Sequence, residues 1–157
     1  MTKTWLLSLQ RCGSINSFKI DGKVYKTKYK IHGLWKQNWI KTARNCKPCG
    51  KMTPNGSCEE KNHNIMKIYK KINSYWKSCK NKNDIGFWKH EYEKHGACTG
   101  LTSDQYFVNT INLFEEAVKR GDGYIDKFYK SNKKEARVYV YYNKKREFEL
   151  HRGYKNR

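Results

Sequence analysis

The chain has 157 residues, the usual size of a single domain, and a chain of this length can bury a hydrophobic core without help from disulfides. Lys and Arg number 34 against 14 Asp and Glu, which gives a net charge of +20, and aromatic residues make up 15%. No apolar run approaches the roughly 18 residues of a transmembrane helix, and two prolines without periodic glycine exclude collagen-like and proline-rich classes. The aromatic content favours a packed fold over disorder.

The first part of the chain predicts two strands and one amphipathic helix. Residues 5–9 are a short apolar strand, and residues 23–31 alternate apolar side chains with lysines, as a half-exposed strand does. Residues 41–58 contain Pro and Gly in patterns typical of loops. From about residue 60 to 77, apolar residues recur at helical spacing, which predicts a helix with its apolar stripe on the core.

Two more helices are predicted in the second half. A turn at residues 81–84 precedes a short helix over residues 87–94. Thr102 and Gln105 have the spacing of a capping box, which opens a longer helix. Gly121 stands where that longer helix would end.

The C-terminal region predicts a β-hairpin, formed by residues 137–142 and 147–150. Strands and helices occur together without a repeating βαβ rhythm, so we expect an α+β fold with helices packed on a mostly antiparallel sheet. No internal repeat or Gly/Ser linker divides the chain, so residues 1–157 are expected to form one domain. Within it, residues 127–157 are the most basic stretch, with 11 Lys and Arg against 3 Glu.

The positive charge predicts a polyanionic partner, and RNA, DNA and an anionic membrane surface are the candidates. The alternative explanation is a lysine-rich solvated face in a chain of biased composition. A membrane-active protein would need a strongly basic amphipathic helix. The helix expected over residues 60–77 is basic, but its aromatic stripe is better explained as core.

Two short segments contain the most informative chemistry. The first is residues 32–35, HGLW, and the second is residues 87–98, FWKHEYEKHGAC. Drawn as a helix at 100° per residue, the second segment places four titratable side chains on a face about 140° wide. These four side chains are His90, Lys94, Glu91 and His95. A helix face that contains them does not suit a hydrophobic core.

These side chains suit the cleavage of RNA. Histidines and a carboxylate can transfer protons near neutral pH, and a lysine can stabilise charge that develops on phosphoryl oxygens. A general base must take the 2′-hydroxyl proton, and a general acid must protonate the leaving 5′-oxygen. Because His32 comes from a different segment, it would allow the general acid and the general base to lie on opposite sides of the phosphate. Trp35 offers a surface on which a base can stack. The alternative is an ordinary exposed helix with charge pairs four residues apart.

Both segments resemble the active-site segments of the ribonuclease T2 family. Residues 32–35 are similar to the first, and residues 90–98, HEYEKHGAC, are similar to the second, in the family's order. Residues 7–10 resemble the family's first core strand, and residues 75–79 resemble the end of the helix before the second segment. The resemblance covers roughly residues 5–120. It implies an α+β endoribonuclease that cleaves single-stranded RNA without a metal, through a 2′,3′-cyclic phosphate.

The resemblance also implies a role for each residue of the catalytic set. His32 and His95 would be the acid–base pair, and His90 would bind phosphate. Glu91 and Lys94 would polarise or stabilise the pentacoordinate phosphate. No cofactor is implied, and neither a membrane nor an obligate protein partner is expected, so the chain is interpreted as a monomer whose partner is its RNA substrate.

Two residues would contact the substrate outside the reacting phosphate. The resemblance assigns base stacking to Trp35 and a substrate contact to Gln10. The chain departs from the family pattern directly after Trp35, because Lys36 stands where the family usually has Pro. The replacement adds a positive charge near the base site and leaves the base preference open.

Six cysteines favour an oxidising compartment and allow up to three disulfides. Six cysteines can pair in fifteen ways, so the residues alone leave the pairing open. The resemblance implies a disulfide between Cys58 and Cys98 and, less directly, one between Cys12 and Cys79. The remaining two cysteines would then be bridged to each other or free.

A zinc site is the competing interpretation of part of this set. Cys46, Cys49, Cys58 and His63 supply four ligands of suitable chemistry. The alternative to an efficient ribonuclease is therefore a basic RNA-binding module with a small zinc site, which would be catalytically weak or inactive.

The expected location follows from the cysteines and the resemblance. A secreted or an endolysosomal or vacuolar protein is predicted, and the sequon Asn55-Gly56-Ser57 would then be a glycosylation acceptor. Residues 1–9 contain an apolar patch that is too short for the core of a signal peptide, so no signal peptide is recognisable.

Overall fold

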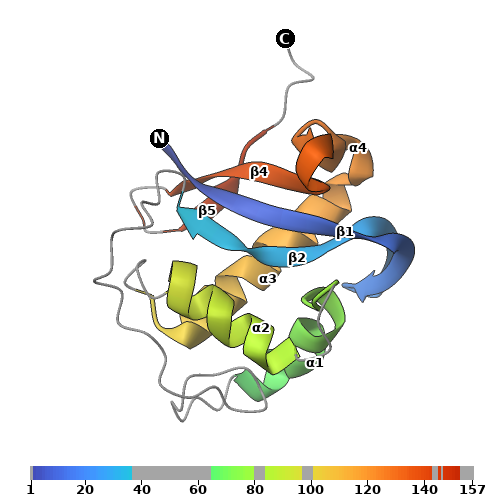
Figure 1. The fold of residues 1–157 in the computed structure, drawn as a ribbon. Helices are drawn as coiled ribbons and strands as arrows, with labels where there is room; N and C mark the ends of the chain where they lie inside the picture. The colour runs from blue at the N-terminus through green and yellow to red at the C-terminus, as the bar shows by residue number, and fades with distance from the viewer. Residues whose placement is uncertain are drawn as a thin grey trace.

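The computed structural model has an α+β fold, in which an antiparallel sheet packs against several helices (Figure 1). This confirms the predicted fold class. The structure describes residues 2–36, 65–79, 84–96, 101–142, 145 and 147–152.

The sheet begins with a long hairpin, formed by β1 (Thr2–Ile20) and β2 (Lys23–Lys36). Asp21 and Gly22 join the strands with positive φ values of 53° and 80°. A two-residue turn of type I′ needs positive φ at both positions, and Asp-Gly is a favoured pair there. The strands are longer than the predicted segments 5–9 and 23–31. The hairpin itself was not predicted, and the Asp-Gly pair was the available signal for it.

Three further strands complete the described sheet. β4 (Glu135–Tyr142) pairs with β1, β3 (Tyr129–Lys130) pairs with β4, and β5 (Phe148–Leu150) also pairs with β4, which gives the order β2-β1-β4-β3. All of these pairings are antiparallel. The predicted C-terminal hairpin is therefore confirmed as β4 and β5.

The helices differ from the predictions mainly at one point. α1 spans Ile65–Tyr75, inside the predicted segment 60–77. The predicted short helix over residues 87–94 is instead α2 (Asp84–Glu91), which continues as a π-helix over Tyr92–Gly96. The winding therefore changes inside the second histidine segment. No helix among the described residues is long and apolar enough to cross a membrane.

α3 (Ser103–Arg120) begins and ends where its sequence signals predict, and α4 (Asp122–Asp126) follows it. The Thr102 hydroxyl accepts a hydrogen bond from the backbone N–H of Gln105, and the Gln105 side chain accepts one from the backbone N–H of Thr102. Gly121 ends the helix with a φ of 95°, a conformation that favours glycine. Both the capping box and the stop are confirmed.

The hydrophobic core lies between the sheet and α3, which passes behind the strands in Figure 1. Leu7 and Leu9 of β1 and Val138 of β4 are fully buried, because alternate residues of a strand point to the same face. Phe107 and Phe114 of α3 are fully buried as well. The intervening strand residues consequently point to the opposite face of the sheet.

A disulfide between Cys12 and Cys79 joins β1 to the segment that follows α1, with the two Cα atoms 5.3 Å apart. This predicted pair is confirmed. The other predicted pair, Cys58 and Cys98, lies outside the described residues. The proposed zinc ligands are also outside them, namely Cys46, Cys49, Cys58 and His63.

Removing this disulfide is expected to destabilise the fold strongly. It links residues 67 positions apart, and cross-linking a loop of that length lowers the entropy of the unfolded chain by an amount worth about 4 kcal/mol at 25 °C. Urea unfolding of the Cys12→Ala, Cys79→Ala double variant should show that loss. As a control, reductant should destabilise the parent by about as much as the double substitution does, and it should have a smaller effect on the double variant. Equal unfolding midpoints for variant and parent would contradict the prediction.

Candidate active site

A β-bulge in β2 sets the position of the first histidine. Ser8 of β1 pairs with Gly33 and the next residue, Leu9, pairs with Ile31, so His32 is an extra residue in its strand. In a regular strand, residues three apart point to opposite faces. The bulge corrects this difference and brings His32 and Trp35 to one face, with their rings 4.8 Å apart.

Buried hydrogen bonds hold the bulge in place. The indole N–H of Trp76 donates to the backbone oxygen of His32 at 2.8 Å, and the indole N–H of Trp88 donates to the backbone oxygen of Trp76. Both tryptophans are almost fully buried, so their N–H groups depend on these partners. The backbone of His32 is thereby tied to α1 and α2.

Tyr106 of α3 connects the two histidine segments. Its hydroxyl accepts from the backbone N–H of Leu34 and donates to the backbone oxygen of Leu34, both at 3.0 Å. Its ring lies against Gly96, where an added Cβ would come within 3.0 Å of the Tyr106 ring. Sequence reasoning placed Tyr106 on the core face of its helix but had no signal for this connecting role.

The second segment separates the predicted side chains into two pairs. Glu91 and His95 are buried, at 2% and 7% exposure, whereas His90 and Lys94 are exposed. π-Helical turns occur often at functional sites. Here the π-helix carries His95 onto Trp35, and the two rings stack with centroids 4.7 Å apart and planes 23° apart. The Trp35 ring, predicted as a base-stacking surface, therefore already contacts the second histidine.

Glu91 lies between the two histidine segments. Its carboxylate accepts from the indole N–H of Trp35 at 2.9 Å and lies 3.5 Å from Nε2 of His32. Gly33 makes room for this contact, because a Cβ on Gly33 would come 2.5 Å from the Glu91 carboxylate and 2.7 Å from the Trp35 nitrogen.

β4 contributes two charged residues that sequence reasoning missed. Glu135 lies 2.9 Å from Nδ1 of His32 and forms an ion pair with Arg137 at 3.3 Å. The Arg137 guanidinium lies 5.1 Å from the centre of the Trp35 ring. Nothing local marks these residues, because their relation to His32 depends on β4 pairing with β1 rather than on any motif.

The predicted catalytic residues meet in one cleft of about 470 Å³. Gln10 is not among its lining residues. The Gln10 amide instead donates to the backbone oxygens of Ile31 and Lys77, at 2.9 and 3.0 Å, which joins β2 to the segment that follows α1. The residues that line the cleft are Leu6, His32, Trp35, Lys36, Phe87, His90, Glu91, Lys94, His95 and Arg137.

The environment of His32 favours its protonated form. Burial alone would lower the pKa of His32, but the hydrogen bonds to Glu135 and Glu91 outweigh burial and raise the pKa to about 9. At neutral pH this imidazole therefore holds a proton that it can donate.

The environment of His95 does the opposite. Burial, together with the charges of Lys94, His32 and His90, outweighs the opposing influence of Glu91 and lowers the pKa of His95 to about 4. At neutral pH this imidazole is therefore a free base. Two titratable groups with pKa values shifted apart are the usual arrangement of an acid and a base in one site.

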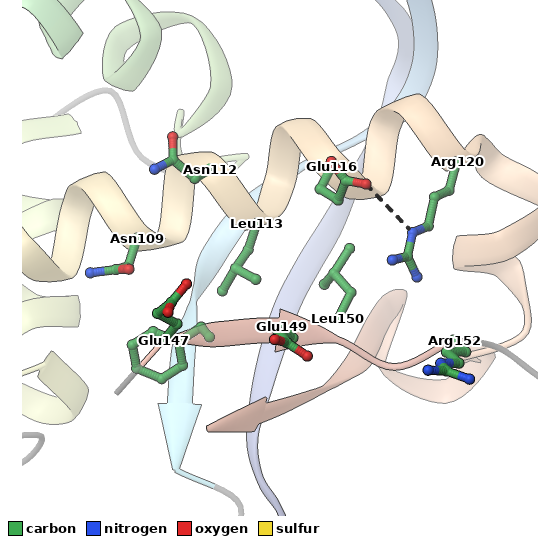
Figure 2. Close-up of a pocket in the computed structure, with 10 residues that line it drawn as sticks. Asn109, Asn112, Leu113, Glu116, Arg120, Glu147, Glu149, Leu150 and Arg152 are labelled. Carbon is green, nitrogen blue, oxygen red and sulfur yellow. Dashed lines mark ion pairs between the residues drawn. The ribbon is translucent and has the colours of Figure 1, made fainter. Parts of the chain in front are cut away.

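The described residues contain no group of three or more His, Cys, Asp or Glu side chains arranged to hold a metal ion. They do contain a second hollow, of about 550 Å³, between α3 and β5 (Figure 2). It shares no lining residue with the histidine cleft and contains no histidine. Figure 2 shows Glu149 of β5 here, along with the ion pair of Glu116 and Arg120.

Two known proteins are similar in sequence to part of this chain. Ribonuclease MC of Momordica charantia is 31% identical over 104 residues, which cover 65% of this chain and 50% of that protein. Ribonuclease Rh of Rhizopus niveus is 26% identical over 123 residues, which cover 72% of this chain and 44% of that protein. The chain thus spans about half the length of these relatives. No solved structure gives a significant match. Residues 1–139 match the Ribonuclease T2 family, and the chain belongs to that family.

Proposed function

We propose that the chain is an endoribonuclease that cleaves single-stranded RNA by acid–base transesterification, without a metal, through a 2′,3′-cyclic phosphate. The observation that supports this best is the pair of histidines in one cleft, with the pKa of His32 raised and the pKa of His95 lowered. Family membership supports ribonuclease activity in general. The names of the two relatives, ribonuclease MC and ribonuclease Rh, agree with it.

The first step needs one base and one acid. His95, neutral at pH 7, takes the proton from the 2′-hydroxyl, whose oxygen attacks the phosphorus. The bond between phosphorus and the 5′-oxygen breaks, and His32 gives its Nε2 proton to the departing oxygen. The products are a 2′,3′-cyclic phosphate and a free 5′-hydroxyl. Hydrolysis of the cyclic phosphate would reverse the roles, with water in place of the leaving group.

The exposed cations of the cleft suit the phosphate. Lys94 and His90 lie on its rim, where they can meet the charge that develops on the phosphoryl oxygens. Trp35 stacks on His95, the proposed general base, and so supports its ring. A nucleobase of the substrate would therefore have to stack on the part of the Trp35 ring that remains exposed. Lys36 lines the same cleft.

The proposal is tested by incubating the protein with a single-stranded RNA in excess EDTA and analysing the ends of the products. We expect cleavage with 2′,3′-cyclic phosphate ends, and a matched DNA should remain intact because it lacks the 2′-hydroxyl. DNA cleavage at a comparable rate would contradict the mechanism. RNA binding without cleavage would instead favour the alternative, a catalytically inactive RNA-binding module with a zinc site.

Two features support a cellular location and a class of substrate for the proposed enzyme. The Cys12–Cys79 disulfide supports an oxidising location, such as a secreted, endolysosomal or vacuolar one. The net charge of +20 supports electrostatic attraction of a polyanionic substrate. Single-stranded RNA is the partner that both the cleft and the charge favour.

A further inference from the structure

Glu135 of β4 belongs to neither histidine segment, yet it makes the shortest polar contact of the His32 side chain among the described residues. We propose that Glu135 is the positioning residue for His32, which holds the imidazole through Nδ1 and so directs Nε2 toward the scissile phosphate. This inference rests on the proposed function, since it assigns a further residue to the same reaction.

The contact crosses a whole strand. β1 lies between β2 and β4, so the two backbones that carry His32 and Glu135 are about 10 Å apart at the usual strand spacing. Ser8 of β1 pairs with Gly33 on one side and Arg137 on the other. Ser8 is small and fully buried, so the His32 and Glu135 side chains can meet above it.

The geometry divides the two ring nitrogens of His32 between two carboxylates. Glu135 lies 2.9 Å from Nδ1, whereas Glu91 lies 3.5 Å from Nε2. During the reaction, a substrate oxygen can take the place of Glu91 at Nε2, whereas the contact between Glu135 and Nδ1 can stay in place. A carboxylate on one nitrogen of a catalytic histidine fixes the ring and the proton position, and it stabilises the imidazolium.

Arg137 keeps Glu135 suited to this role. Burial alone would raise the pKa of Glu135, but its hydrogen bonds and charge interactions with His32 and Arg137 outweigh burial and lower the pKa. The carboxylate is therefore ionised at neutral pH, where His32 is protonated. The other titratable groups that face His32 or line its cleft are Glu91 from α2, His90 from the same helix, Lys94 and His95 from the π-helix, and Lys36 from β2.

The test compares Glu135→Gln and Glu135→Ala with Glu149→Gln. Gln keeps the shape, and its amide oxygen can still accept a hydrogen bond from the Nδ1–H of His32, whereas Ala removes the contact altogether. Glu149 lies on the neighbouring strand β5, in the hollow of Figure 2, and provides the same substitution outside the cleft. Two quantities are measured for each protein: the His32 pKa by NMR titration, and kcat/KM for an RNA dinucleotide against pH.

For Glu135→Gln we expect a lower His32 pKa and an alkaline limit of kcat/KM that moves down with it. Glu135→Ala should lose about a hundredfold in kcat at neutral pH, since a misplaced catalytic group costs that much. The loss should be smaller for Glu135→Gln. Glu149→Gln should behave as the parent.

An unchanged His32 pKa and pH profile in both Glu135 variants would overturn the inference, as would equal changes in Glu149→Gln. A purely structural role for Glu135 would lower the thermal midpoint without moving the profile, and that result also overturns it. If the parent cleaves no RNA, the proposed function fails, while the NMR titration still reports whether Glu135 holds His32.

Discussion

Replacement of either cleft histidine by alanine is expected to lower kcat by about 10²–10⁴-fold, the usual contribution of a general acid or base. His95→Ala removes the neutral imidazole that accepts the 2′-hydroxyl proton. His32→Ala removes the imidazolium that protonates the leaving oxygen. Because the two groups serve one transition state, the double variant should lose much less than the product of the single losses.

Single-turnover cleavage of an RNA dinucleotide measures these effects, with circular dichroism to confirm folding. His151→Ala provides a matched control, because His151 follows β5 and is not a lining residue of the cleft. His90→Ala should mainly raise KM, since His90 is exposed on the rim and is assigned to phosphate binding. A near-parental rate for His32→Ala or His95→Ala would remove that residue from the acid–base pair.

Gly33→Ala is expected to reduce kcat by about a hundredfold, although it adds only a methyl group. The new Cβ would come 2.5 Å from the Glu91 carboxylate and 2.7 Å from the Trp35 indole nitrogen, so these hydrogen-bonded groups would have to move. Trp35 stacks on His95, and Glu91 contacts His32. A shift of either residue therefore displaces the acid or the base.

The matched control is Gly123→Ala, where an added Cβ meets no heavy atom within 4 Å. Both variants should fold, and steady-state kinetics with a thermal melt separates loss of activity from loss of stability. Parental kcat in Gly33→Ala would show that the contact between Glu91 and Trp35 does not position the catalytic groups.

Features that depend on local sequence were predictable. The capping box at Thr102 and the glycine stop at Gly121 are short-range signals, and the structure shows both. The C-terminal hairpin follows from two alternating segments around a turn. The histidine segments were recognisable for the same reason, because the residues that carry their chemistry are close together in the chain.

Features that depend on tertiary pairing were not predictable. A helix of uniform winding placed His90, Glu91, Lys94 and His95 on one face, but in the structure Glu91 at the end of α2 and His95 in the π-helix are buried, whereas His90 and Lys94 are exposed. The bulge at His32 exists only in the register between β1 and β2. The contact with Glu135 spans 103 residues of sequence, and no periodicity marks it.

The pH dependence of kcat/KM for a single-stranded RNA dinucleotide, measured with EDTA present, tests the roles of the two histidines most directly. The base must be unprotonated and the acid protonated, so activity should fall below the pKa of His95, about 4, and above the pKa of His32, about 9. A broad plateau between these limits is the expected result. A narrow optimum with both limits near 6.5, the ordinary histidine value, would contradict the shifted pKa values on which the assignment of His95 as base and His32 as acid is based.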